Sequence, residues 1–281
     1  ACKKKRNGCE KSRNCSFILE LNVKEVAAAS NQTGRSFPLG ATVNADGVNF
    51  SIFSKNATAI DLLLFDAVDD AQPARVISLD PRANRTFHYW HVVVPDIKPG
   101  QLYAYRAHGP FDPNEGLRFN PEKVLLDPYG KGVMIPNRYH RAAAFNPGDN
   151  TQCAMKSVIA DPLLYDWEGD VTLKRPFGRT VIYEMHVKGF TFHPSSGVEP
   201  IRRGTYAGLI EKISYLQKLG VTAVELLPVF QFDETEAPKG LTNYWGYNPV
   251  SFFAPVTANF AKRTAPDSRC SFMRSSKASA A

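Results

Sequence analysis

The sequence contains no run of 18 apolar residues, so we expect no membrane-spanning helix and no membrane partner. Cysteine is scarce as well, with five residues in 281, and no two of them form a CxxC pair. The sequence therefore offers no zinc-ligand set, and we expect neither a metal nor a cofactor. The odd number and wide spacing of the cysteines argue against a disulfide framework and favour a reducing compartment. We take this compartment to be the cytoplasm, with a plastid stroma as the alternative.

A net positive charge is missing from most of the chain, although the formal net charge of the whole is +7. Residues 1–13 hold six Lys or Arg against one Glu, and residues 262–281 hold five against one Asp. The segment between these two ends is close to neutral. A basic footprint on one face, which nucleic-acid binding needs, is not indicated. We expect no nucleic-acid partner and interpret the basic ends as irregular or disordered.

Residues 36–108 have the pattern of a string of short strands. Val48, Phe50 and Ile52 alternate with polar residues, which predicts a half-buried strand. Short strands separated by turn signals every ten or so residues indicate a β-sandwich of about 100 residues. Further strands are expected at 60–64, 75–79, 87–94 and 102–108, with turns at Asp46-Gly47 and Pro99-Gly100.

Residues 109–178 are rich in Pro, Gly, Asp and Asn, and they show little periodicity. A flexible linker is one interpretation of this composition. The segment also carries Phe111, Phe119, Leu125 and Tyr129, which are too many large apolar groups for a solvated spacer. We therefore expect an ordered connection that packs onto a neighbouring domain.

From residue 180 the pattern becomes strand, helix, strand. The apolar run VIYEMHV (181–187) predicts a strand, and VTAVELLPVF (221–230) predicts a second, buried one. Between them, apolar residues recur at helical spacing, with Thr205 placed to cap the helix and Gly220 to end it. This order indicates a parallel βαβ unit, whose ligands lie beyond the C-terminal ends of the strands. The apolar helix face comprises Tyr206, Leu209, Ile210, Ile213, Leu216 and Leu219.

Four stretches give the chain a recognisable resemblance. They are GRSFPLGATVNADGVNFSIFS, YAYRAHGPFDPNEGLRFNPEKVLLDPYGK, the βαβ stretches VIYEMHVKGFTFHPSSGV and RGTYAGLIEKISYLQKLGVTAVELLPVFQFDE, and NYWGYNPVSFFAP. Together they resemble the N-terminal half of isoamylase-type glycogen or starch debranching enzymes, which belong to glycoside hydrolase family 13 of the α-amylase superfamily. The first stretch is similar to the family-48-type carbohydrate-binding module of these enzymes.

The resemblance implies an N-terminal Ig-like β-sandwich followed by the first βαβ part of a truncated (β/α)8 barrel. After Pro255 the sequence departs from the family, somewhere between Val256 and Lys262, and we expect a truncated or frame-shifted end. The expected division is an irregular basic segment 1–35, a β-sandwich module 36–135, an ordered connection 136–178, an incomplete barrel 179–260 and a disordered basic tail 261–281.

The resemblance also implies an activity, the retaining hydrolysis of α-1,6 branch points in glycogen or starch-like glucans. Such hydrolysis needs two carboxyl groups about 5–5.5 Å apart, and the family carries them on later barrel strands. The acidic residues present near the expected strand ends do not replace them, so we expect no catalytic residue and no hydrolysis by this chain alone. A non-catalytic α-glucan-binding or regulatory fragment is the alternative. These acidic residues are Glu184 and Glu225 in mid-strand, where they would satisfy barrel hydrogen bonds or ion pairs, and Asp233, Glu234 and Glu236 in one loop.

Aromatic residues supply the candidate substrate contacts. By resemblance, Tyr247 stacks on the sugar ring next to the scissile bond and Trp245 lines the cleft, since an aromatic face suits the apolar face of a pyranose. The expected partner is an α-glucan such as glycogen or amylopectin, and the oligomeric state stays open. We assign His186 and His193 core or loop-ordering roles. In the module, Tyr89, Trp90 and His91 offer a glycan platform, but neighbouring strand residues face opposite sides, and a buried Trp90 is the favoured alternative.

Overall fold

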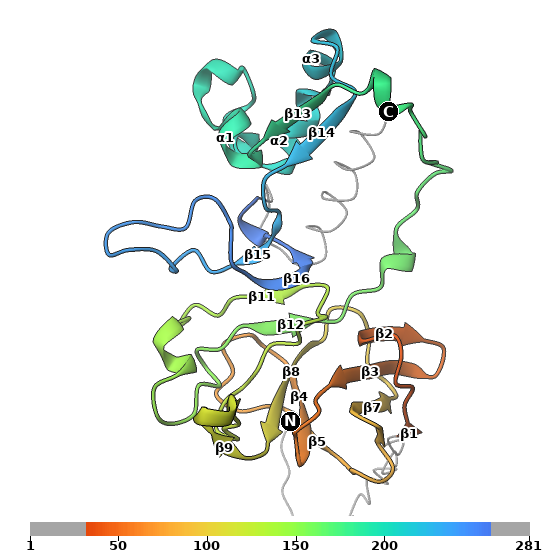
Figure 1. Ribbon diagram of the computed structural model, residues 1–281, viewed down its shortest axis with the longest axis vertical. Coiled ribbons are helices and arrows are strands. Elements are labelled where there is room, and N and C mark those ends of the chain that lie inside the picture. Colours follow the sequence, from red (N-terminus) through yellow and green to blue (C-terminus); the bar gives the residue numbers. More distant parts are fainter. Residues whose placement is uncertain (1–31, 260–281) are drawn as a thin grey trace, which may run out of the picture.

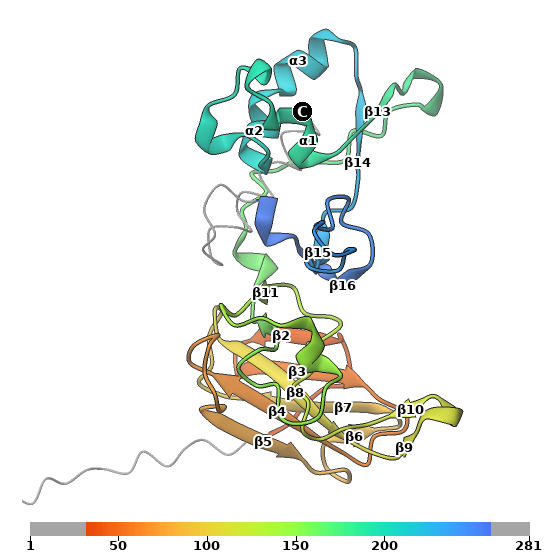
Figure 2. The same ribbon diagram turned by 90° about the vertical axis from the view of Figure 1, so that its left-hand side faces the viewer.

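The computed structural model describes residues 32–259 as two stacked bodies, a β-sandwich and a smaller α/β unit (Figures 1 and 2). The irregular ends expected from the sequence therefore fall almost entirely outside the described residues. Within the described part, no helix is long and apolar enough to cross a membrane.

The sandwich consists of two antiparallel sheets. The first has the order β1-β7-β3-β2, with β6 paired to β7, and the second has the order β11-β12-β8-β4-β5. A β9–β10 hairpin projects beside them. The strands are β1 (Gln32–Thr33), β2 (Gly40–Asn44), β3 (Gly47–Phe53), β4 (Ala59–Phe65), β5 (Arg75–Leu79), β6 (Arg85–Thr86), β7 (Tyr89–Val94), β8 (Leu102–His108), β9 (Phe111–Asp112), β10 (Leu117–Arg118), β11 (Val133–Met134) and β12 (Lys156–Val158).

Both turns predicted from the sequence are present. Gly47 closes the β2–β3 hairpin opposite Asn44 with a φ of +129°, and a Cβ there would lie 2.4 Å from a backbone oxygen of Val94. Gly100 has a φ of +98°, and the N–H of Gln101 donates to the carbonyl of Lys98 at 3.2 Å. This geometry is a type II turn, which requires a positive φ at its third residue.

The core between the sheets comes from alternate positions of the facing strands. Phe50, Trp90 and Tyr103 are buried, and the rings of Phe50 and Tyr103 meet edge to face at 5.1 Å. The prediction of a half-buried strand at 48–52 is wrong, because the polar face is covered as well. Asn49 exchanges hydrogen bonds with the backbone of Arg35 at 2.7 and 3.0 Å, so the N-terminal segment supplies the partners that a buried amide needs.

The second sheet recruits residues that lie far along the chain. Ser157 on β12 pairs with Tyr103 on β8, and Val133 on β11 pairs with Ser157. We therefore propose that the module runs to about residue 159, beyond the boundary expected at 135. Residues 161–179 then form the connection, and their apolar side chains are exposed instead of packing on a neighbour. The large exposed ones are Leu163, Leu164, Trp167, Val171, Leu173 and Phe177.

The smaller body begins with two parallel strands. β13 (Ile182–Met185) and β14 (Ala223–Leu226) pair in register, which confirms the expected βαβ unit. Its core gathers Met185, Tyr206, Leu209 and Leu216. The fold agrees with the expected first part of an incomplete barrel, and no closed barrel forms among the described residues. Three α-helices lie between the two strands in sequence: α1 (Val187–Phe192), α2 (Tyr206–Glu211) and α3 (Ile213–Lys218).

Three local predictions differ from the structure. The first strand ends at Met185, two residues before the predicted end at Val187, where α1 begins. The single helix expected at 205–219 is divided at Lys212, whose N–H reaches back only three residues to the carbonyl of Leu209. The second strand is also divided, near Pro228, which has no N–H to continue a ladder. As predicted, Thr205 caps α2 by accepting a hydrogen bond from the N–H of Gly208.

The chain then returns to the sandwich. β15 (Phe230–Phe232) and β16 (Pro249–Pro255) form an antiparallel pair that lies between the two bodies (Figure 1). Tyr129 of the module stacks on Phe253 at 5.6 Å, and the hydroxyl of Ser251 donates to the carbonyl of Gly130. The two bodies are therefore joined by packed side chains as well as by the connection.

Candidate functional site

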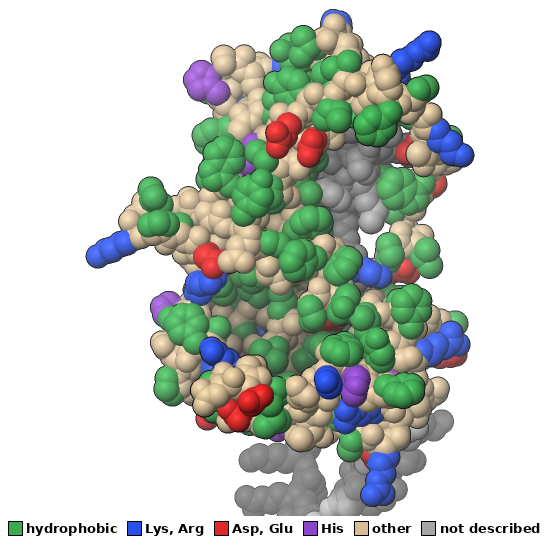
Figure 3. Space-filling model, viewed as in Figure 1, with side chains coloured by type: hydrophobic (Ala, Val, Ile, Leu, Met, Phe, Trp, Pro, Cys, Tyr) green, Lys and Arg blue, Asp and Glu red, His purple; other side chains and the backbone are tan. Residues whose placement is uncertain are grey.

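The site lies at the C-terminal ends of β13 and β14, where ligands of parallel α/β folds bind. His186 follows β13 directly and forms the N-cap of α1. The loop between β15 and β16, residues 233–248 and here named the aromatic loop, carries Tyr244, Trp245 and Tyr247, and the first two of these pack against His186. Hydrophobic side chains gather on this face of the molecule, with acidic side chains next to them (Figure 3).

His186 orders the site through both ring nitrogens. Its Nδ1 accepts a hydrogen bond from the N–H of Gly189 at 3.0 Å, and its Nε2 lies 2.9 Å from the carbonyl oxygen of Tyr244. An accepting Nδ1 and a donating Nε2 assign the neutral tautomer with the proton on Nε2. Burial lowers the pKa of His186 and the charge of Lys188 adds to this, although the hydrogen bond to Tyr244 opposes it. With both nitrogens engaged, the imidazole serves as a structural tie between α1 and the aromatic loop.

The rings form a compact stack around this tie. The imidazole of His186 lies nearly parallel to the ring of Tyr244, with 4.4 Å between centroids and 13° between planes. Trp245 meets both rings edge on, at 6.0 Å from His186 and 5.3 Å from Tyr244. Gly189 makes room for the stack, because a Cβ at this position would lie 2.6 Å from the hydroxyl of Tyr244.

The two predicted substrate contacts, Trp245 and Tyr247, are exposed while their backbone is held. Their side chains are 56% and 60% exposed. Asn243 accepts the N–H of Gly246 at 3.1 Å and donates to the carbonyl of Tyr247 at 2.9 Å. Gly246 has a φ of +78° and packs closely on Phe232, so a side chain there would be strained. The result is a pair of exposed aromatic faces on an ordered turn.

The mid-strand carboxylates, Glu184 and Glu225, differ from what the sequence predicts. They are direct register partners on β13 and β14, and both side chains are exposed. Neither makes an ion pair within residues 32–259, so the expected ion-pairing role is not seen. Like charges directly opposite each other on a ladder repel.

The loop carboxylate Asp233 has a role that the sequence did not predict. It is 1% exposed and accepts hydrogen bonds from the hydroxyl of Tyr139 at 2.6 Å and from Arg141 at 3.1 Å. Thr235 donates to its other oxygen through both N–H and hydroxyl. Burial works to raise the pKa of Asp233, but these donors outweigh it and lower the pKa. A carboxylate so occupied is a structural anchor and has no free lone pair for chemistry.

Nothing in the local sequence pattern reveals Tyr139 or Arg141 as partners of the loop. They lie more than 90 positions before it, in a segment without periodicity. Arg141 also donates to Glu236 at 2.5 Å, so two of the three acidic residues of this loop are held by the module. The pKa of Arg141 is raised, chiefly by its hydrogen bond to Asp233.

The module does not form a glycan platform from Tyr89, Trp90 and His91. Trp90 is fully buried, as favoured from the sequence, and its indole N–H donates to the carbonyl of Ser54 at 3.3 Å. His91 is 3% exposed and pairs with the hydroxyl of Thr86, which leaves Tyr89, partly exposed against Phe53. His193 pairs with the hydroxyl of Ser195 in its own turn, which agrees with a loop-ordering role. In the part of the chain that the structure describes, no three His, Cys, Asp or Glu side chains converge as metal ligands.

Comparison with known proteins agrees with the fold and the resemblance. Residues 38–130 match the family of carbohydrate-binding module 48, described as the isoamylase N-terminal domain. The chain is 44% identical over 239 residues to the glycogen operon protein GlgX homolog of Mycobacterium tuberculosis H37Rv, covering 79% of this chain and 32% of the relative. It is 42% identical over 241 residues to the glycogen debranching enzyme of Serratia proteamaculans, covering 82% of this chain and 35% of the relative.

Solved structures give the same picture. The GBS pullulanase SAP, crystallised with maltotetraose, has a TM-score of 0.66 and 25% identity, covering 89% of this chain and 32% of that one. Pullulanase from Paenibacillus barengoltzii, with maltotetraose, has a TM-score of 0.65 and 23% identity, covering 86% and 36%. The second likeness shows the fold alone. The chain spans about a third of the length of the relatives it matches, and its resemblance to the N-terminal part of isoamylase-type enzymes is confirmed.

Proposed function

We propose that this chain, which contains a carbohydrate-binding module 48, is the N-terminal part of a debranching glycoside hydrolase. The proposed substrate is the α-1,6 branch point of glycogen or of a starch-like glucan, cleaved with retention of configuration by family resemblance. The observation that carries the proposal is the exposed pair Trp245 and Tyr247 on the aromatic loop, which packs through Trp245 against His186 at the end of β13. A relative named as a glycogen debranching enzyme supports it.

In this proposal the aromatic loop binds the glucan. Tyr247 stacks on the sugar ring next to the scissile bond, and Trp245 lines the cleft. The ring of Trp245 packs against His186 and Tyr244, and the side-chain amide of Asn243 holds the backbone carbonyl of Tyr247. Aromatic side chains have few rotatable bonds, so contact with a pyranose face costs little conformational entropy.

The catalytic carboxylates are proposed to lie on parts of the relatives that this chain does not match. A retaining hydrolase needs a nucleophile and a separate acid/base. Among the described residues, Asp233 and Glu236 are bound by the module, and Glu184 and Glu225 lie on adjacent strands with no ordering partner. The 281-residue chain alone is therefore proposed to be inactive, since unsupported carboxylates do not hold catalytic geometry.

Reducing-end formation tests the proposal. The purified chain and its full-length relative from Serratia are incubated with pullulan and with glycogen, and new reducing ends are counted. The expected result is release by the full-length relative and none by this chain. Release by this chain at an ordinary rate would show that the groups proposed to be absent are present.

A second candidate function is a non-catalytic α-glucan-binding or regulatory fragment. The same exposed aromatic faces favour it, because they do not depend on catalytic residues. Retention of the chain on immobilised glycogen, together with the absence of hydrolysis, is its expected signature. We further propose that the chain resides in the cytoplasm. The free thiol of Cys153 is compatible with such a reducing compartment.

A further inference from the structure

The aromatic loop is held at its base by the sandwich module. Its first residue, Asp233, is buried and receives the hydroxyl of Tyr139 and the guanidinium of Arg141. Tyr139 and Arg141 belong to the module side of the junction and lie beside a cavity of about 330 Å³ that Val250 of β16 also lines. The contact therefore crosses from one body of the molecule to the other.

A continuous series of hydrogen bonds leads from this base to the exposed rings. The carbonyl of Glu234, next to Asp233, accepts the N–H of Asn243 at 2.9 Å, which closes the loop on itself. The side chain of Asn243 then holds Gly246 and the carbonyl of Tyr247. The turn that carries both proposed sugar contacts is thus linked to the neighbour of Asp233 through one backbone hydrogen bond and the side chain of Asn243.

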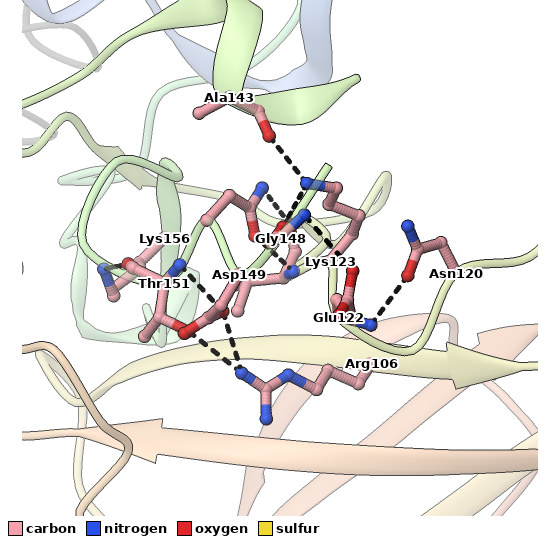
Figure 4. Close-up of polar contacts among 11 residues, drawn as sticks. Arg106, Asn120, Glu122, Lys123, Ala143, Gly148, Asp149, Thr151 and Lys156 are labelled. Carbon is pink, nitrogen blue, oxygen red and sulfur yellow. Dashed lines mark hydrogen bonds and ion pairs between the residues drawn. The ribbon is translucent and has the colours of Figure 1, made fainter. Parts of the chain in front are cut away.

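The module side of this contact is itself fixed. Arg141 begins a short 3-10 helix (Arg141–Ala144), and Lys123 donates from its ammonium to the carbonyls of Ala143 at 3.0 Å, Asn146 and Gly148 (Figure 4). Lys123 is only 6% exposed, so its charge is satisfied by this ring of carbonyls.

A second set of contacts connects the residues after this 3-10 helix to strand β8 of the sandwich. Arg106 on β8 bonds Asp149 at 3.1 Å and Thr151 at 2.9 Å, and Figure 4 shows these groups converging beneath the segment. The segment that follows Arg141 is therefore tied to the sandwich sheet through Asp149 and Thr151.

We propose that Tyr139 and Arg141 are positioning residues that set how strongly the aromatic loop binds α-glucan, without touching the glucan themselves. This inference rests on the proposed function for its ligand, but the ordering of the loop is a separate and measurable claim. The module then contributes to the substrate site by holding the aromatic loop in place, in addition to any contact that the module itself makes with glycan.

Amide hydrogen exchange on the whole 281-residue chain tests the ordering. The variants are Tyr139→Phe, Arg141→Gln and the double substitution. Arg138→Gln is the matched control, because within residues 32–259 the side chain of Arg138 bonds inside the module, to Gln152. Losing a hydrogen bond to a charged group is expected to speed exchange at the Asn243 and Gly246 amides by about tenfold. The control variant should leave them unchanged. The amide of Tyr105, bonded within the sandwich, should exchange equally slowly in every variant.

Glucan affinity is measured on the same proteins with maltohexaose as the probe. We expect binding to weaken about three- to tenfold in Tyr139→Phe and Arg141→Gln, with partial recovery in Arg141→Lys, which restores the charge but not the two-pronged geometry. Unchanged exchange at Asn243 and Gly246 overturns the inference, as does faster exchange with unaltered affinity. If wild-type protein does not bind maltohexaose, the proposed function fails, and the exchange data still decide whether the module orders the loop. Tyr139→Phe, which removes one hydroxyl, decides the outcome if Arg141→Gln does not fold.

Discussion

The imidazole of His186 and the phenol ring of Tyr244 lie face to face, 4.4 Å apart and 13° from parallel. His186 comes directly after the first parallel strand, while Tyr244 belongs to a loop 58 positions later. Their contact therefore fixes the aromatic loop against the strand ends. It assigns His186 the structural role expected from the sequence, through a partner that the sequence did not reveal.

The space for this stack depends on Gly189. In Gly189→Ala, the new methyl group would meet the hydroxyl of Tyr244, which sits at the free end of its side chain, so Tyr244 is expected to shift while the fold survives. Helix propensity favours Ala over Gly by up to about 1 kcal/mol, so the free energy of unfolding should not fall. Tryptophan emission should change because Trp245 packs on the displaced ring. Gly178→Ala, where a Cβ meets open space, is the matched control and should leave the emission spectrum as it was.

Trp90 and Tyr89 are neighbours on β7 with opposite surroundings. Trp90 is 0% and Tyr89 is 36% exposed. Trp90→Ala should lower the free energy of unfolding by about 3–5 kcal/mol, since it leaves a large cavity in the sandwich core. Tyr89→Ala should cost less than half as much. Urea denaturation of both variants measures the difference, and equal costs would contradict the burial of Trp90.

Asp127 makes the stability of the sandwich depend on pH. Its carboxylate is fully buried and accepts bonds from the hydroxyl of Tyr103 and the N–H of Tyr129, both at 2.8 Å. Burial raises its pKa from 3.8 to about 6, more than these bonds lower it. A raised pKa in the folded state means that stability is highest below the unfolded value and is lost as the pH rises toward 6.

We therefore expect wild-type protein to lose up to about 3 kcal/mol relative to Asp127→Asn between pH 4 and pH 7. The amide of Asn can still accept from Tyr129, and its nitrogen can donate to the hydroxyl of Tyr103. Urea unfolding at the two pH values measures this difference. Asp46→Asn, in an exposed hairpin turn, is the control. A constant gap between wild type and Asp127→Asn at both pH values would show that Asp127 does not titrate in this range.

Local patterns predicted those features of the fold that local chemistry determines. The strands at 75–79 and 102–108 have the predicted bounds, and the Pro99-Gly100 turn follows from the one backbone geometry those residues favour. The parallel pairing of β13 with β14 follows from the strand, helix, strand order. The division of the helix at Lys212 was not predicted, because the apolar spacing continues across it.

Only part of the candidate site could be predicted from the sequence. Trp245 and Tyr247 were found by resemblance, and their exposure agrees with a contact role that stays a prediction. The partners of Asp233 were missed because Tyr139 and Arg141 approach it only through tertiary packing. The local sequence around an acidic loop residue does not reveal whether its side chain faces solvent or a distant arginine.

The central claim is that Trp245 and Tyr247 form the glucan-binding surface of this chain. Affinity electrophoresis in gels containing amylopectin measures it directly and is suited to weak binding. Trp245→Ala and Tyr247→Ala should each weaken retardation about three- to tenfold, since each removes a stacking face. Phe177→Ala, an exposed aromatic outside the aromatic loop, should migrate as wild type does. The account predicts loss of retardation in the double variant, and retardation equal to that of wild type would contradict it.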